Sequence, residues 1–254
     1  MNRQAQAAVL FLVGGALLHA GTTSLYLRYV KAGLQPLLLA AGAVLIVAAA
    51  ATFWYELRRT RAARRHPGGE AHDQHDEHAD GHGHAHREPR ISWLLVLPLF
   101  ALILVAPPAL GSYSAVRSGT ALQQPLAYPA LPSGDPVRLG LVDYAGRAAY
   151  GHGRSLRGRR VEITGFVALD HTGAPYLVRM ALNCCAADAQ PVKIGLTGKL
   201  PPVLQPDSWL DVTGTYTAKR TEDPVNGGII PYLDVIRAKP VATPGDPYDE
   251  SWNS

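Results

Sequence analysis

Long apolar runs are the feature that most restricts how this chain can fold. Residues 7–27 and 34–55 are nearly continuous in apolar side chains, and a third run of this kind covers residues 91–110. Each run is long enough to cross a hydrocarbon core of about 30 Å as a helix. The sequence therefore predicts a membrane α-helical part, residues 1–55 and 91–110, with three transmembrane helices.

The first run has a second reading as a cleavable signal peptide, because Arg3 precedes it. We favour a membrane span. The run exceeds the roughly 7–15 residues of a signal-peptide core, no convincing cleavage site follows it, and the second run comes immediately after it. The third run contains Pro98, which lipid-embedded helices tolerate when neighbouring groups bond to the freed carbonyl.

Arginines next to the apolar runs predict the orientation in the membrane. The first connection carries Arg28 and Lys31, whereas five arginines follow the second run directly, namely Arg58, Arg59, Arg61, Arg64 and Arg65. Cytoplasmic loops carry the excess of Lys and Arg, so we expect the loop 56–90 in the cytoplasm. The C-terminal part is then extracytoplasmic, and the protein is a multi-pass protein of the cell membrane.

Histidines and acidic residues dominate the loop before the third run. Seven histidines lie between His66 and His86, with five acidic residues from Glu70 to Asp80. Without an apolar period the segment is expected to be disordered, and its composition suits weak, multi-site binding of zinc or another divalent transition metal. A solvated linker that binds nothing is the other reading. The candidate ligands are His72, His75, His78, His82, His84 and His86.

The remaining residues divide into a tether, a domain and a tail. Residues 111–136 are rich in Pro, Ser, Gly and Ala and predict an extended tether, while 241–254 read as a flexible tail. The domain, 137–240, is expected to open with a short helix whose apolar side holds Leu139, Val142, Tyr144 and Ala148.

Five short strands follow that helix. Apolar alternation between Gly, Pro and Asp predicts them over 159–170, 175–183, 190–196, 208–219 and 229–236. Gly165 and Gly214 fall where strands can bend sharply. A sandwich normally needs about seven strands, so we expect a small all-β, OB-like barrel.

Both cysteines of the chain, Cys184 and Cys185, stand side by side. A regular strand would point them to opposite faces, but a strand that ends at Asn183 places both thiols in a turn, where they can face one site. Three readings are open: two small buried apolar side chains, a strained vicinal disulfide, or a zinc-like site with Asp188 and with His171 or Asp170 of the preceding hairpin. Asp188 can equally cap the turn.

His19 lies inside the first apolar run, close to Thr22, Thr23 and Ser24. A histidine in hydrocarbon is costly unless it faces protein or water, so these residues predict a polar stripe that faces a partner or a conduit. Snorkelling of the side chain to the nearer interface is the other reading.

Several function classes find no support in the sequence. The net charge of +4 is modest, and the basic run 154–160 has no stacking aromatic residues around it, which argues against nucleic acid. The chain has no nucleophile elbow, phosphate-binding loop or HExxH motif, so we expect no enzyme. A thiol–disulfide enzyme is a minor reading, because the pair lacks the C-x-x-C helix start that lowers a thiol pKa.

The segment RMALNCCAADAQPV, residues 179–192, with VEITGFV at 161–167 before it, resembles the YcgQ-like family of bacterial membrane proteins. These are described as permease subunits, and the resemblance covers most of the chain. It implies a role for Cys184, Cys185 and Asp188, and for the partner-contact or structural positions Arg179, Ala187, Pro191, Gly165 and Phe166. Arg179 can pair with Asp188 or lie in solvent.

The resemblance implies an accessory subunit of a larger, multi-span permease linked to zinc or other metal homeostasis. Three helices provide too few walls for a solute path, which agrees with a partner that supplies the pore. The other reading is a membrane-anchored extracytoplasmic binding or assembly module, in which the cysteines hold structure and no metal takes part.

Overall fold

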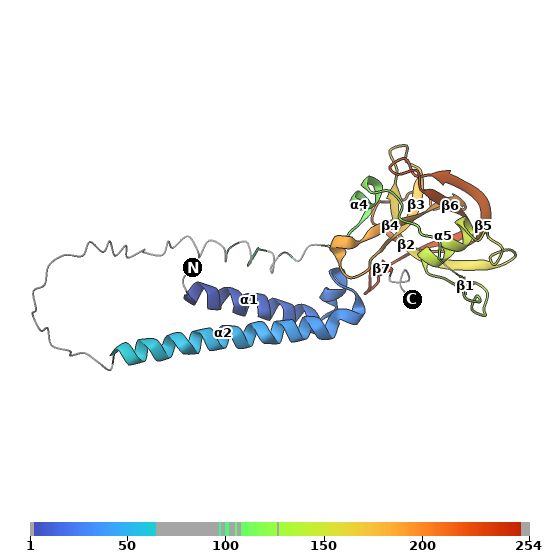
Figure 1. The fold of residues 1–254 in the computed structure, drawn as a ribbon. Coiled ribbons are helices and arrows are strands. Elements are labelled where there is room, and N and C mark those ends of the chain that lie inside the picture. Colours follow the sequence, from blue (N-terminus) through green and yellow to red (C-terminus); the bar gives the residue numbers. More distant parts are fainter. Residues whose placement is uncertain are drawn as a thin grey trace, which may run out of the picture. The chain divides into compact units, whose positions relative to one another are not determined.

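The computed structural model describes residues 3–64, 97, 100–101, 105, 108–125 and 127–249 (Figure 1). They fall into two compact units, one made of Met1–Thr23 with Gln35–Pro107 and one made of Ser24–Leu34 with Pro108–Ser254. The short connection between the first two apolar runs therefore belongs to the same unit as the C-terminal part of the chain.

Two helices of the first unit are long and apolar enough to cross a membrane. α1 spans Arg3–Thr22 and α2 spans Gln35–Arg64, and they match the first two predicted spans. Glycines let them approach closely, since a Cβ added at Gly14 would lie 3.0 Å from the carbonyl oxygen of Gly42.

Most of the third predicted span, 91–110, lies outside the described residues, and among the described residues the structure supports two candidate spans and not three. The histidine-rich segment, residues 66–90, also lies outside them. Its binding of metal stays a prediction.

Five strands of the second unit close into a mixed barrel, which confirms the predicted number of strands. They are β2 Arg160–Leu169, β3 Pro175–Ala181, β4 Gln190–Gly198, β5 Trp209–Glu222 and β6 Ile229–Val241. The ring runs β2–β3–β4–β6–β5 and back to β2, with β4 and β6 parallel and the other pairs antiparallel. Closure leaves none of these five strands with a free edge along its whole length.

The barrel interior is apolar and is continued by a helix. The predicted short helix is present as α5, Leu141–Ala149, and its residues Leu141, Tyr144, Ala145 and Ala148 share one core with Val161, Ile194, Leu233 and others from the strands. The Tyr144 hydroxyl donates to the carbonyl oxygen of Tyr232 at 2.7 Å. Leu139 precedes the helix and packs against the same core.

The segment 111–136 differs from the extended tether that was predicted. It contains the helix α4, Ser112–Arg117, whose Ala115 is fully buried in a second apolar cluster with Phe166, Trp209 and other barrel residues. Further along, Leu122 and Leu131 pack against the first core. These apolar side chains therefore attach the segment to the barrel, although its Pro and Gly content resembles that of a linker.

The end of the domain also differs from the flexible tail that was predicted for 241–254. Tyr248–Asp249 form β7, which pairs in parallel with β3, and a second two-residue strand, β1 (Val137–Arg138), pairs with β2. The buried Tyr248 hydroxyl donates to the carbonyl oxygen of Arg28 at 3.0 Å and accepts from the Leu110 N–H at 3.3 Å. One side chain thus joins three distant segments.

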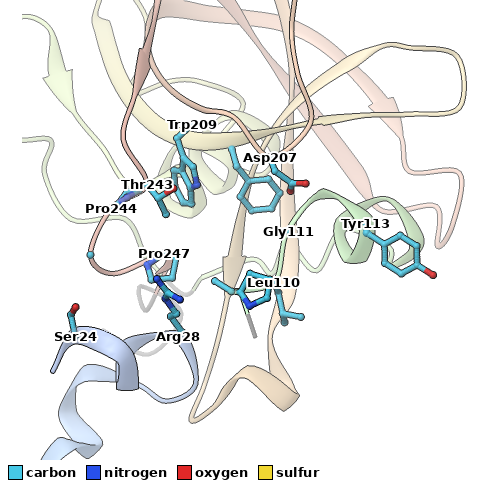
Figure 2. Close-up of a pocket in the computed structure, with 14 residues that line it drawn as sticks. Ser24, Arg28, Leu110, Gly111, Tyr113, Asp207, Trp209, Thr243, Pro244 and Pro247 are labelled. Atoms are coloured by element: carbon cyan, nitrogen blue, oxygen red, sulfur yellow. The ribbon is translucent and has the colours of Figure 1, made fainter. Parts of the chain in front are cut away.

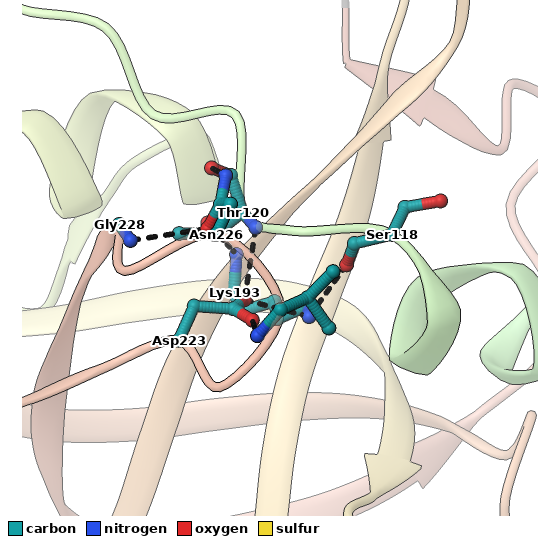
Figure 3. Close-up of polar contacts among 7 residues, drawn as sticks. Ser118, Thr120, Lys193, Asp223, Asn226 and Gly228 are labelled. Carbon is teal, nitrogen blue, oxygen red and sulfur yellow. Dashed lines mark hydrogen bonds and ion pairs between the residues drawn. The ribbon is translucent and has the colours of Figure 1, made fainter.

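A buried ion pair attaches the segment after α4 to the barrel (Figure 3). The Lys193 Nζ of β4 lies 2.7 Å from the Asp223 Oδ2, and the two side chains are only 5% and 0% exposed. Lys193 also donates to the Ser118 carbonyl at 2.8 Å, and Asp223 accepts the Thr120 N–H at 2.8 Å. Each of the four groups therefore has a hydrogen-bond partner within the protein.

Replacing Gly165 of β2 by valine should destabilise the barrel by about 1–3 kcal/mol through overpacking. A Cβ at this position would lie 2.8 Å from the backbone oxygen of Val178 and 2.8 Å from Leu177 Cγ, so the backbone itself must shift. Chemical denaturation of the full chain in detergent measures the change. Gly245→Ala is the control, because a Cβ there meets nothing within 4 Å; equal losses in both variants would contradict the packing argument.

Candidate functional site

The two cysteines lie in a turn, as predicted, and not in a strand. β3 ends at Ala181, Cys185 is extended, and a short 3-10 helix, η4, covers Ala186–Asp188. Because the strand has ended, the alternation of side chains no longer separates Cys184 from Cys185. Both are free thiols, with Cys184 exposed and Cys185 half-buried.

Asp188 closes this turn with its carboxylate. One oxygen accepts the Asn183 N–H at 3.0 Å, while the other accepts the Cys184 N–H and the Cys184 thiol, both at 3.0 Å. The predicted capping role of Asp188 is therefore confirmed. The same carboxylate also lies against the thiol, so capping does not remove it from the site.

Three potential metal ligands gather in the turn. The Sγ atoms of Cys184 and Cys185 and a carboxylate oxygen of Asp188 all lie within 4.8 Å of one another. A tetrahedral zinc ion with Zn–S bonds of about 2.3 Å and Zn–O bonds of about 2.0–2.2 Å would hold such atoms within roughly 4 Å of each other, so small side-chain rotations bring the three into range. The exposed side of Cys184 leaves room for a fourth ligand.

His171 and Asp170 do not belong to this group of three. The Asp170 carboxylate accepts from the N–H and hydroxyl of Thr172 and from the Ala174 N–H, all within 2.9 Å, which fixes the hairpin turn. His171 lines a separate cavity of about 290 Å³ together with Tyr176 and Lys193. Their proposed part in a shared metal site therefore finds no support in the structure.

The protonation of the turn is set by its hydrogen bonds. The hydrogen bond to Asp188, followed by that to Cys185, raises the pKa of the Cys184 thiol to about 12. For Asp188, burial acts to raise the pKa, but hydrogen bonds from the Cys184 thiol and from three backbone N–H groups outweigh it, and the pKa is lowered. Without a metal ion the turn thus holds a carboxylate that accepts from a neutral thiol.

Cys184 should therefore be a slow nucleophile whose reactivity rises when Asp188 is replaced by asparagine. In a Cys185→Ser background with chelator at about pH 8, Asp188→Asn should speed alkylation of Cys184 by iodoacetamide at least about tenfold, because the thiolate fraction grows as the pKa falls toward about 8.5. The lower nucleophilicity of a less basic thiolate offsets part of the gain. Asp170→Asn is the control; an unchanged rate in the Asp188 variant would refute the assigned hydrogen bond.

The segment 29–31 pairs with the cysteine turn, and the sequence contains no signal for this contact. The Lys31 N–H donates to the Cys184 carbonyl at 3.1 Å, the Ala186 N–H donates to the Tyr29 carbonyl at 2.7 Å, and Val30 and Cys185 form an isolated antiparallel bridge. These residues lie in the connection between α1 and α2, beside the 3-10 helices η1 (Ser24–Arg28) and η2 (Ala32–Leu34). The turn is thus held on two sides, by its own Asp188 and by this connection.

Arg179 occupies neither of its two predicted places. Its guanidinium donates to the carbonyl of Tyr248 at 2.8 Å and to that of Asp246 at 3.4 Å, and it lies 5.0 Å from the centre of the Trp209 ring. Burial lowers its pKa. Arg179 therefore holds the β7 segment and contacts the Trp209 ring instead of pairing with Asp188.

The other predicted positions divide between structure and surface. Gly165 and Phe166 belong to the barrel, where Phe166 makes an edge-to-face contact with Trp209 at 5.7 Å between ring centres. Pro191 is buried and its carbonyl accepts the Ala121 N–H at 2.9 Å, whereas Ala187 is exposed beside the thiols. His19 is exposed on α1, and the hydroxyls of Thr22 and Thr23 bond back to helix carbonyls, including that of His19.

Comparison with known proteins finds one family model that matches the barrel region of the chain. Residues 147–249 match the family described as DUF1980 C-terminal domain, and this range contains all five barrel strands and the cysteine turn. No curated protein and no solved structure matches the chain. The resemblance to YcgQ-like permease subunits stays a prediction.

Proposed function

We propose that this chain is a membrane-anchored accessory subunit of a permease system, and that its cysteine turn binds a divalent transition metal, with zinc the first candidate. The observation that carries the proposal is the position of the turn. Cys184, Cys185 and Asp188 lie within 4.8 Å of one another on a turn whose backbone pairs with the connection between two apolar helices. Metal binding at the thiols would therefore act on a segment whose two ends continue into those helices.

The chemistry of the donor set supports a borderline-soft ion. Thiolate sulfur favours zinc and similar ions, whereas calcium and magnesium prefer oxygen ligands alone. Two thiolates and one carboxylate would supply three protein ligands, and the exposed face at Cys184 would leave the fourth position to water or to a group from a partner. Structural zinc sites have four protein ligands, so an open position of this kind suits transfer of the ion better than a purely structural role.

The proposed topology places the OB-like barrel outside the cytoplasm. Arg58, Arg59 and Arg61 lie near the end of α2, the end expected in the cytoplasm. The connection before α2 belongs to the barrel unit and precedes the other end of α2, so the proposal assigns the barrel to the side of the membrane opposite to those arginines. The chain must then cross once more before Pro108, and the predicted third span at 91–110 would supply this crossing.

A larger permease is the proposed partner, and the lipid bilayer surrounds the helices. Large apolar side chains of α2, including Val44, Val47, Phe53 and Trp54, are exposed in the first unit. Lipid or the helices of a partner would cover them. Two or three helices are too few to surround a substrate site at the membrane midplane, so we assign the transport pathway to that partner.

Zinc titration of the full chain in detergent tests the proposal. The six candidate histidines of the histidine-rich segment are first replaced by asparagine, so that they no longer compete with the turn for zinc. We expect one zinc per chain in this background. Cys184→Ser should lower the zinc affinity by about 100-fold or more, because losing a group that only hydrogen-bonds to a metal ligand already lowers metal affinity by about 10–100-fold. Affinity should rise with pH, by up to about tenfold per pH unit for each proton released, because the ion displaces the Cys184 proton.

Ala187→Ser is the matched control, since it changes an exposed residue of the same turn. If the Cys184→Ser and Ala187→Ser proteins bind zinc equally, the metal proposal is wrong. Should the cysteine variants instead melt at a lower temperature while the unmodified chain binds no metal, the alternative of a membrane-anchored binding or assembly module is supported.

A further inference from the structure

A cavity of about 600 Å³ lies in the barrel unit between η1 and the barrel wall (Figure 2). Its volume is within the range of about 300–1,000 Å³ that is typical of small-molecule sites. Much of its lining is apolar or aromatic: Leu110, Phe166, Trp209, Pro244 and Pro247. The cavity is distinct from the cysteine turn, because none of Cys184, Cys185 and Asp188 lines it.

The polar part of the lining carries a positive charge. Arg28 is exposed, and its side chain extends from η1 toward Pro247 in Figure 2. Among the described residues its guanidinium has no hydrogen-bond or ion-pair partner, whereas both oxygens of Asp207, the acidic residue of the lining, accept from the N–H and hydroxyl of Ser112 at 2.6 and 2.9 Å. The unsatisfied donors of the cavity therefore favour an anion.

The lining also includes residues that lie next to two of the predicted membrane spans. Ser24 follows the end of α1 by two residues, and Pro108 to Leu110 form the end of the third predicted span. Two separate segments thus enter the cavity from sequence positions next to lipid. Arginine side chains favour the interface between headgroups and water, and the exposed Arg28 fits that preference.

We propose that this cavity binds the headgroup of an anionic phospholipid, with its phosphate on Arg28 and its glycerol and upper acyl carbons on the apolar wall. The Ser24 and Thr243 hydroxyls offer further donors to the phosphate oxygens. The volume suits a headgroup and the first carbons of its chains, so the tails would remain in the bilayer. The inference rests on the membrane anchoring proposed above but is independent of metal binding.

Fluorescence quenching in vesicles tests this site, because Trp209 lies in its wall. The full chain, with Trp54, Trp93 and Trp252 replaced by phenylalanine, is reconstituted into phosphatidylcholine vesicles that contain a minority of phosphatidylglycerol. Bromine is placed near the top of the acyl chains of one lipid at a time. Quenching by brominated phosphatidylglycerol should exceed the share of that lipid in the bilayer several-fold.

Two variants of the same connection give a matched pair. Arg28→Gln should reduce the preference for phosphatidylglycerol about tenfold, as expected for one lost hydrogen bond to a charged group. Lys31→Gln removes the same charge three residues away, outside the lining, and should leave the preference unchanged. Quenching that follows bulk composition in the parent protein, or that falls equally in both variants, would overturn the proposal. Zinc affinity, measured in parallel, shows whether the metal proposal fails with it.

Discussion

Replacing Asp223 by alanine should lower the free energy of unfolding by about 3–5 kcal/mol, because it leaves the Lys193 charge buried without a partner. Lys193 is 5% exposed and lies 2.7 Å from the Asp223 carboxylate, so water cannot readily replace the lost anion. Asp223 also accepts the Thr120 N–H and the Val225 N–H, which lose their acceptor in the variant. Denaturant unfolding of the full chain in detergent, followed by tryptophan fluorescence, measures the loss.

An exposed ion pair of the same length provides the control. Arg160 and Asp135 also lie 2.7 Å apart, but their side chains are 52% and 58% exposed. Since exposed pairs contribute little, Asp135→Ala should leave the unfolding midpoint nearly unchanged. A similar loss in both variants would mean that burial does not set the importance of the Lys193–Asp223 pair.

A double variant separates the charge from the hydrogen bonds. Lys193→Met with Asp223→Asn removes both charges but keeps an amide oxygen for the Thr120 N–H. This protein should recover much of the lost stability, because a buried pair that is replaced as a whole leaves no unpaired charge. If the double variant is as unstable as Asp223→Ala, the backbone contacts and not the ion pair hold the segment 118–120.

Replacing Tyr144 by alanine should destabilise the barrel by about 3–5 kcal/mol, the range for large aromatic side chains of a core. Tyr144 is fully buried where α5 packs against the strands. Burial also raises the pKa of its hydroxyl well above the usual value, so the group stays a neutral donor to the Tyr232 carbonyl throughout the accessible pH range. The loss should therefore be constant up to about pH 10 and shrink above it, because the tyrosine of the unfolded chain ionises there while the buried one stays neutral.

Tyr144→Phe distinguishes packing from hydrogen bonding at this position. Phenylalanine keeps the ring in the core and removes only the donor to Tyr232, so we expect a loss of about 1 kcal/mol. Tyr150 lies just past the end of α5 but is only half-buried, with its hydroxyl on the Leu122 carbonyl at 3.1 Å. Tyr150→Ala should cost clearly less than Tyr144→Ala, and thermal melting of all three variants makes the comparison. Equal losses would show that α5 is not part of the core.

Local patterns in the sequence were sufficient for much of this architecture. Periodic apolar residues between glycines and prolines located all five long strands and the helix around Tyr144, because side-chain alternation and turn chemistry are properties of a few neighbouring residues. The same pattern of turn residues predicts that β3 ends before Cys184. With it came the expectation that both thiols and Asp188 face one site, since a turn removes the alternation of a strand.

Long-range contacts decided what those patterns left open. The composition of segment 111–136 is that of a linker, yet Ala115 and the Lys193–Asp223 pair attach it to the barrel. The apolar cluster around Ala115 and the buried Asp223 carboxylate exist only after the barrel has folded. Arg179 finds carbonyls of the returning chain because β7 lies beside β3.

The contact between Tyr248 and Arg28 joins residues that are 220 positions apart, and the bridge between Val30 and Cys185 is similarly remote. A short-range pattern carries no information about such partners, because they meet only after the barrel has closed. Local sequence therefore predicted the five long strands, the two long apolar helices, the short helix around Tyr144 and the turn that holds the cysteines. Tertiary structure decided what each of them touches.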